Sequence, residues 1–286
     1  MRGVSLPLVL VLGLALAACA PALRKPAVLP PATRGAGAAA AARLLADADA
    51  AFGRRPDPAA VRRAEALYRE AAQADPGAVE GPYGAARAVI WLAEHERSAA
   101  ERARLATSAV ELGQLCEARA PEEARCAYAL ALGLGIQARE RRSTAAEGLK
   151  LMVERLRRAA ARDPALDEAG PERVLALLLL RAPGWPLGPG DPEAGLAEAK
   201  KAASRAPEFP PNLLALAEAL AANGDPAAGR AAAGRALALA ERRAAAGEPD
   251  APEWVVEARR LLAAPAQAPD AREPRSESSS AGRNIG

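Results

Sequence analysis

Apolar residues recur every three to four positions along most of the central chain, the spacing that places them on one face of an α-helix. These runs predict first helices at 36–53, 79–95, 122–140, 170–182 and 210–222, and second helices that begin near 57, 98, 144, 191 and 225. A last run, 252–263, predicts a terminal capping helix. No stretch shows the period-two alternation of a β-strand, so the sequence predicts an all-α fold.

Polar residues mark where the second helices begin. At three starts an aspartate precedes a proline at the first helical position, where its carboxylate can accept from a free backbone N–H: Asp57, Asp191 and Asp225. At the other two a hydroxyl residue is followed three residues later by a glutamate, the spacing of a capping box: Ser98 with Glu101, and Thr144 with Glu147.

Four prolines close similar amphipathic runs, and each stops a helix because proline cannot continue one. Pro76, Pro121, Pro164 and Pro207 are 45, 43 and 43 residues apart. A recurring period in this range is typical of stacked helical hairpins. The sequence therefore predicts a tetratricopeptide-like solenoid of about five hairpins plus a C-terminal capping helix, in one domain that spans 36–263.

The first unit carries a specific resemblance. AEALYREAAQADPGA resembles the second half of a tetratricopeptide repeat, through the small, aromatic, small and proline positions Ala64, Tyr68, Ala71 and Pro76. Later units depart from that pattern, because Gly113 and Ala199 stand where an aromatic residue is usual.

A narrower resemblance covers about 58–263. A glycine-rich loop with an aspartate, a helix that ends near a proline and a following LAE helix are similar to the lipoprotein T-components of tripartite ATP-independent periplasmic (TRAP) transporters. The matching positions are Gly188, Gly190, Asp191, Pro207 and Leu216 to Glu218. The resemblance implies a periplasmic helical scaffold that docks a solute-binding protein, with a channel for an apolar ligand.

The chain ends predict export and anchoring. Residues 1–18 have a basic start and an apolar core that is too short to span a membrane, as in a signal peptide. Cys19 follows Leu16-Ala17-Ala18, which resembles a lipobox and implies acylation, with palmitate among the chains; an ordinary signal peptide, cut after Ala17 or Ala20, is the alternative. Segment 19–35 reads as a proline-rich tether and 264–286 as a disordered tail.

The residue after Cys19 is Ala20 rather than aspartate. By resemblance to the sorting of such lipoproteins, this favours the outer membrane of a Gram-negative cell, facing the periplasm. Export also predicts an oxidising compartment, where Cys116 and Cys126 flank a turn and can form a disulfide. Two buried free thiols are the alternative.

Charge and chemistry narrow the function classes. The net charge of +3 is small and both signs alternate along the helices, so no nucleic-acid partner is expected. The only histidine, His95, lies between Glu94 and Glu96, and adjacent residues do not share a helix face, so we interpret it as a solvated helix end rather than a metal ligand. We expect no catalytic residue, metal or cofactor.

The predicted contact site is the loop Pro183–Pro192. Trp185 and Leu187 are apolar residues on a connector fixed by prolines and glycines, with Asp191 at its end, and such residues can mark a partner-binding loop. The alternative is that both fold back onto the helices beneath.

The sequence predicts a lipid-anchored scaffold of the cell envelope that binds another periplasmic protein, with a TRAP-type solute-binding subunit as one partner. The alternatives are a pilotin-type lipoprotein that assists assembly of an envelope complex, and a carrier of an apolar small ligand.

Overall fold

A computed structural model describes residues 37–264. The signal peptide, Cys19, the tether and nearly all of the predicted tail lie outside the described residues. Within them the chain forms eleven α-helices and one short 3₁₀ helix, and no strand. The bounds are α1 Ala38–Phe52, α2 Pro58–Ala74, α3 Glu80–His95, α4 Ala99–Arg119, α5 Ala124–Glu140, η1 Arg142–Thr144, α6 Ala145–Arg162, α7 Gly170–Arg181, α8 Pro192–Arg205, α9 Pro210–Ala222, α10 Pro226–Ala245 and α11 Ala251–Ala263.

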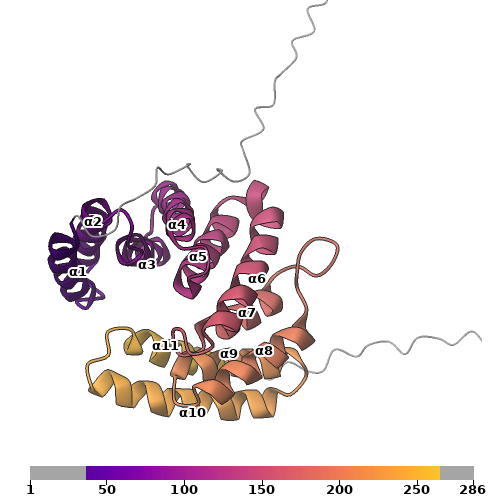
Figure 1. The fold of residues 1–286 in the computed structure, drawn as a ribbon. Coiled ribbons are helices and arrows are strands. Elements are labelled where there is room, and N and C mark those ends of the chain that lie inside the picture. Colours follow the sequence, from indigo (N-terminus) through magenta and orange to yellow (C-terminus); the bar gives the residue numbers. More distant parts are fainter. Residues whose placement is uncertain (1–36, 265–286) are drawn as a thin grey trace, which may run out of the picture.

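The helices stack as five hairpins closed by a single helix, which confirms the predicted fold class. Each helix packs against the next, and α1 also contacts α3, α3 contacts α5, α7 contacts α9 and α9 contacts α11. Figure 1 shows the hairpins following an arc, so that the indigo N-terminal hairpin and the yellow C-terminal helices end on the same side. The odd-numbered helices therefore form the inner face.

The helix boundaries follow the sequence signals closely. Four second helices, α2, α4, α6 and α8, each end two residues before one of the spaced prolines. The aspartate caps are confirmed, because Asp57, Asp191 and Asp225 accept from the backbone N–H groups of Ala59, Ala194 and Ala228.

The two predicted capping boxes did not form as expected. Ser98 caps α4 by accepting from Glu101 N–H, but the Glu101 carboxylate pairs with Arg104 and Glu96 takes the Ser98 N–H instead. Thr144 makes no cap at all. A 3₁₀ turn precedes α6, and there the Thr144 hydroxyl donates back to the Arg141 carbonyl.

Small residues set the distance between helices. A Cβ placed on Gly113 of α4 would lie 2.6 Å from the Leu130 Cα of α5, closer than real atoms approach. Ala106 and Ala109, on the same helix, are fully buried. Gly113 stands where the tetratricopeptide pattern has an aromatic residue, and the close α4–α5 contact leaves no space for one.

A buried polar network joins the two halves of the arc between α6 and α7. Asp167, Glu168 and Ala169 all have positive φ (51°, 54° and 63°), a conformation that costs non-glycine residues free energy. Arg173 donates to the carbonyls of Asp167 and Glu168, and the fully buried Asn212 of α9 donates to Glu168 and accepts from Arg173. These bonds hold the left-handed turn in place.

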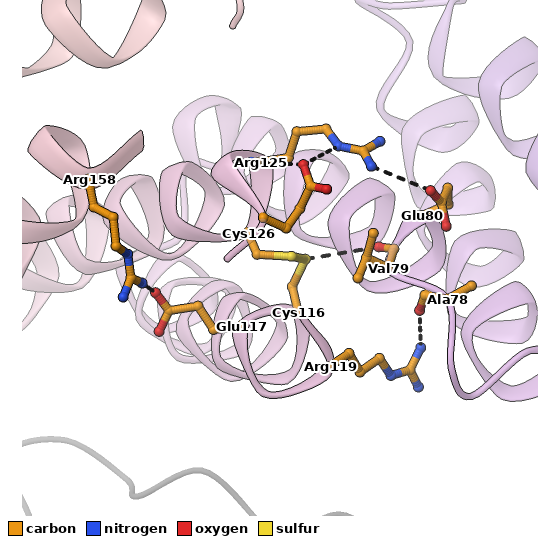
Figure 2. Close-up of a disulfide and its surroundings, with 10 residues drawn as sticks. Ala78, Val79, Glu80, Cys116, Glu117, Arg119, Arg125, Cys126 and Arg158 are labelled. Carbon is orange, nitrogen blue, oxygen red and sulfur yellow. Dashed lines mark hydrogen bonds and ion pairs between the residues drawn. A yellow bond between two sulfur atoms is a disulfide. The ribbon is translucent and has the colours of Figure 1, made fainter. Parts of the chain in front are cut away.

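Cys116 and Cys126 form a disulfide between the end of α4 and the start of α5, with their Cα atoms 5.1 Å apart (Figure 2). Both residues are fully buried beside Val79. Closing a loop of this sequence separation, 10 residues, stabilises a fold by about 2–3 kcal/mol through the unfolded chain. Nearby, Arg119 donates to the Ala78 carbonyl at 2.7 Å, which ties α4 to the preceding hairpin.

Replacing Gly113 by alanine is predicted to destabilise the protein by about 1–3 kcal/mol, because its Cβ would meet the Leu130 backbone. The matched control is Gly234→Ala in α10, where an added Cβ meets nothing within 4 Å. Gly234→Ala should stabilise the folded protein by about 0.5–1 kcal/mol, because alanine is favoured over glycine in a helix by this amount. Chemical denaturation of both variants tests the pair, and equal effects would show that the α4–α5 contact is not as close as described.

Candidate functional site

Aromatic side chains are scarce in this chain and are gathered on its inner face. The sequence holds eight: three Trp, three Tyr and two Phe. Six of them line one cavity enclosed by the arc: Phe52, Tyr83, Trp91, Tyr128, Phe209 and Trp254. Because aromatic rings supply most of the contact energy in binding sites, this concentration makes the cavity the candidate functional site.

The cavity has a volume of about 360 Å³ and is open to solvent. Its described walls come from the odd-numbered helices α1, α3, α5, α7, α9 and α11, from the connection that follows α1, and from those that precede α7, α9 and α11. Sequence-distant segments therefore meet there, and the site exists only because the arc brings α11 opposite α1 and α3 (Figure 1).

Two polar contacts, which we call the clasp, connect the ends of the arc across the cavity mouth. The first joins Arg55, after α1, to Asp250, before α11, through two hydrogen bonds of 2.9 and 3.0 Å. A guanidinium that binds both carboxylate oxygens is held in one orientation. The Arg55 guanidinium also stacks over the Phe52 ring, 4.0 Å from its centre.

The second clasp contact is made by His95, which is exposed at the C-terminal end of α3, as the sequence predicted, and also contacts a distant helix. The imidazole stacks on Trp91 with the ring centres 3.8 Å apart, and Nε2 lies 2.8 Å from a carboxylate oxygen of Glu253 on α11. Nδ1 lies 2.7 Å from the Trp91 carbonyl oxygen. Both neighbours are acceptors only, so both ring nitrogens must carry a proton to satisfy them.

The surroundings of His95 act on its pKa in both directions. Burial opposes the charged ring, but the hydrogen bonds to the Trp91 carbonyl and to Glu253, together with the negative charges of Glu253 and Glu94, outweigh it. The pKa of His95 is therefore raised above its usual value. The imidazolium also suits its place at the C-terminus of α3, where the helix dipole favours a positive charge.

At the inner end of the cavity, Tyr128 donates to the Asp167 carboxylate at 2.8 Å, and Arg173 pairs with the same oxygen at 2.6 Å. Burial, followed by the charge of Asp167, raises the pKa of Tyr128 well above its usual value, so the phenol remains a hydrogen-bond donor. These groups belong to the network that holds the left-handed turn, and they position the cavity wall.

Two charged side chains of α3 face the cavity without an opposite charge within ion-pair distance among the described residues: Arg87 and Glu94. The Arg87 guanidinium lies 4.8 Å from the centre of the Phe52 ring and 5.7 Å from that of Tyr83. Glu94 is accessible from the cavity yet surrounded by protein, and this desolvation raises its pKa against the effect of the nearby Arg139.

The loop that the sequence predicted as a contact site lies outside the cavity. Trp185 and Leu187 are 90% and 75% exposed, so they do not fold back onto the helices. The loop is closed at its base by Gly190 N–H donating to the Pro183 carbonyl, and Asp191 serves as the cap of α8. Leu187 and the helix α6 border a separate open groove of about 570 Å³.

Two other kinds of site are missing from the part of the chain that the structure describes. Among residues 37–264, no three His, Cys, Asp or Glu side chains gather where they could hold a metal ion. Over the same range, every helix is too short or too polar to cross a membrane.

The sequence analysis did not predict the cavity. The available signal was the scarcity of aromatic residues, six of which fall in or beside the predicted first helices and the capping helix.

No family profile matches the chain, and no curated protein sequence is significantly similar to it. Among solved structures, the chain is similar to a tetratricopeptide-repeat protein of the thermophile Thermus thermophilus. The two share 19% sequence identity and a TM-score of 0.54, over 78% of this chain and 98% of the other. At this level of identity the comparison shows the fold, which is tetratricopeptide-like.

The His95–Glu253 contact predicts a pH-dependent stability. Because the folded-state pKa of His95 is raised above the ordinary value of 6.5, its contribution is fully present below pH 6.5 and is lost as the pH rises through the folded-state pKa. Glu253→Gln should therefore lower the melting temperature near about pH 5.5 and change it little near about pH 8.5.

The matched control is Asp250→Asn, which removes the other clasp contact. Arg55 keeps its charge throughout this pH range, so loss of the Arg55–Asp250 contact should lower the melting temperature equally at both pH values. A Glu253→Gln effect that does not vary with pH would contradict a protonated His95 in the clasp.

Proposed function

We propose that the protein is a binding scaffold that takes an extended segment of a partner protein into its aromatic cavity. The carrying observation is that six of the eight aromatic side chains line this one cavity. Phe52, Trp91 and Tyr128 are largely buried in the core beneath the cavity, whereas Tyr83, Phe209 and Trp254 are partly exposed. The partly exposed rings are therefore available for contact on the inner face.

The chemistry of the lining supports a peptide rather than an apolar small molecule. Seven side chains with full charges and one histidine line the cavity together with the aromatic rings. Charged groups lose hydration when an apolar molecule covers them, whereas a peptide offers both apolar and polar groups to such a wall.

We further propose that the scaffold is held in the cell envelope by a lipid at Cys19, with the cavity presented to periplasmic proteins. The supporting observations are the short apolar leader, the Leu-Ala-Ala-Cys sequence that ends at Cys19, and a disulfide between Cys116 and Cys126 that suits an oxidising compartment. The resemblance of the 188–218 region to TRAP T-components supports a solute-binding subunit as the partner.

Selection of random linear peptides displayed on phage tests the cavity. Peptides enriched on the purified chain should bind at least about tenfold more weakly to Tyr83→Ala, which removes an aromatic wall, and to Leu132→Trp, which fills the cavity from α5. A solute-binding protein encoded beside this chain's gene should show the same losses.

The matched control is Trp185→Ala, which removes an exposed aromatic ring outside the cavity and should leave both peptide binding and melting temperature unchanged. Melting curves establish that each cavity variant is folded. If folded Leu132→Trp protein retains the peptides and Trp185→Ala loses them, the binding surface is the loop and the cavity proposal is wrong.

Lipid attachment is tested by expressing the full chain in a Gram-negative host with labelled palmitate. The chain should take up the label and sediment with membranes, and Cys19→Ala should do neither. An unlabelled, soluble product of the unaltered chain, cut after Ala17 or Ala20, would establish an ordinary signal peptide instead.

A further inference from the structure

We propose that the cavity recognises a segment that carries one acidic and one basic side chain about three residues apart, through Arg87 and Glu94. This inference rests on the proposed function and adds the chemical class of the bound segment. The inference has two grounds. Six of the ionisable side chains in the cavity wall pair with one another, and the two that have no partner there, Arg87 and Glu94, lie at a defined distance from each other.

The cavity wall holds eight ionisable groups besides its tyrosines: three arginines, one histidine and four carboxylates. Three pairs account for six of them. Arg55 Nε lies 2.9 Å from Asp250 Oδ1. Arg173 Nη2 lies 2.6 Å from Asp167 Oδ2. His95 Nε2 lies 2.8 Å from Glu253 Oε1. Arg87 and Glu94 are left, one of each sign.

The surroundings of Arg87 favour a carboxylate ligand. Its guanidinium is exposed to the cavity and lies near the rings of Phe52 and Tyr83. Aromatic rings orient a guanidinium without satisfying its N–H donors, so its planar edge can bind both oxygens of an incoming carboxylate. The neighbouring cation, Arg55, is already neutralised by Asp250, so it does not compete for that carboxylate.

The surroundings of Glu94 favour a cation. The carboxylate faces the cavity, and desolvation raises its pKa. Among the described residues, no N–H group or ion pair contacts it. An ammonium or guanidinium group placed there would compensate for the desolvation. The charges of Arg139 and His95 lower the pKa of Glu94 only partly, and each has its own ion pair, with Glu140 and Glu253, respectively.

The two groups also have a defined separation. They are seven residues apart on α3, which is two helical turns, so both point from the same face and lie about 10 Å apart along the axis. A peptide in the polyproline II conformation advances about 3.1 Å per residue and repeats every three residues, so side chains i and i+3 lie on one face about 9 Å apart. An acidic and a basic side chain spaced i and i+3 therefore match the two sites.

A double-mutant cycle with four fluorescent peptides tests this inference. The probes are GAAPEAPKAPAG and its versions with Gln for Glu, Gln for Lys, and Gln for both. Arg87→Gln should weaken binding of the Glu-containing peptides about fivefold to tenfold and leave the others unchanged. Glu94→Gln should act in the same way on the Lys-containing peptides, and both effects should shrink as salt rises.

The matched controls are Arg157→Gln and Glu147→Gln on α6, exposed residues that change the net charge equally but lie outside the cavity. They should leave all four affinities unchanged. Melting curves of Arg87→Gln and Glu94→Gln establish that each variant is folded, which separates recognition from folding.

The outcomes distinguish the two proposals. If all four peptides bind equally and the affinities are unchanged in Arg87→Gln and Glu94→Gln, the inference is overturned while the peptide-binding function stands. If the charged peptides bind but the α6 controls weaken them as much, recognition is a long-range effect of net charge and the inference also fails. If no peptide binds and phage selection finds none, both proposals fail.

Discussion

The buried network between α6 and α7 is the constraint on which the rest of the structure depends. Three consecutive non-glycine residues, 167–169, adopt left-handed conformations that are unfavourable by themselves. Arg173 and Asn212 compensate by binding the carbonyl groups of this turn, and Tyr128 binds the Asp167 carboxylate. The network thus connects α5, α7 and α9, and it fixes the direction in which the second half of the arc leaves the first.

The direction of the second half of the arc creates the cavity on which the proposed function depends. With it, α11 comes to lie opposite α1 and α3, where Asp250 and Glu253 meet Arg55 and His95. The same turn carries Asp167, which forms part of the cavity wall. Folding stability and site geometry therefore depend on the same few hydrogen bonds, and a change in the network would alter both the cavity shape and the clasp.

Packing within the hairpins and recognition on the inner face use different residue types for a physical reason. Glycine and alanine let α4 and α5 approach until Gly113 touches the Leu130 backbone, and they lose little side-chain entropy when buried. Tyr68 packs against Gly84 at the α2–α3 contact, but six of the eight aromatic rings lie on the wider inner face. There they bound a space with both signs of charge, in which Arg87 and Glu94 retain their capacity to bind a ligand.

The sequence by itself determined the helices, because their signals are local: amphipathic spacing, aspartate caps at Asp57, Asp191 and Asp225, and prolines that stop four of the five second helices. It failed at Thr144, where a 3₁₀ turn replaced the expected cap, since the chain entering α6 takes a tighter path than the pattern reveals. Only the tertiary structure decided the cavity and the role of His95. Glu253 is 158 residues away from it, and no local pattern reports a contact made by the curvature of a whole solenoid.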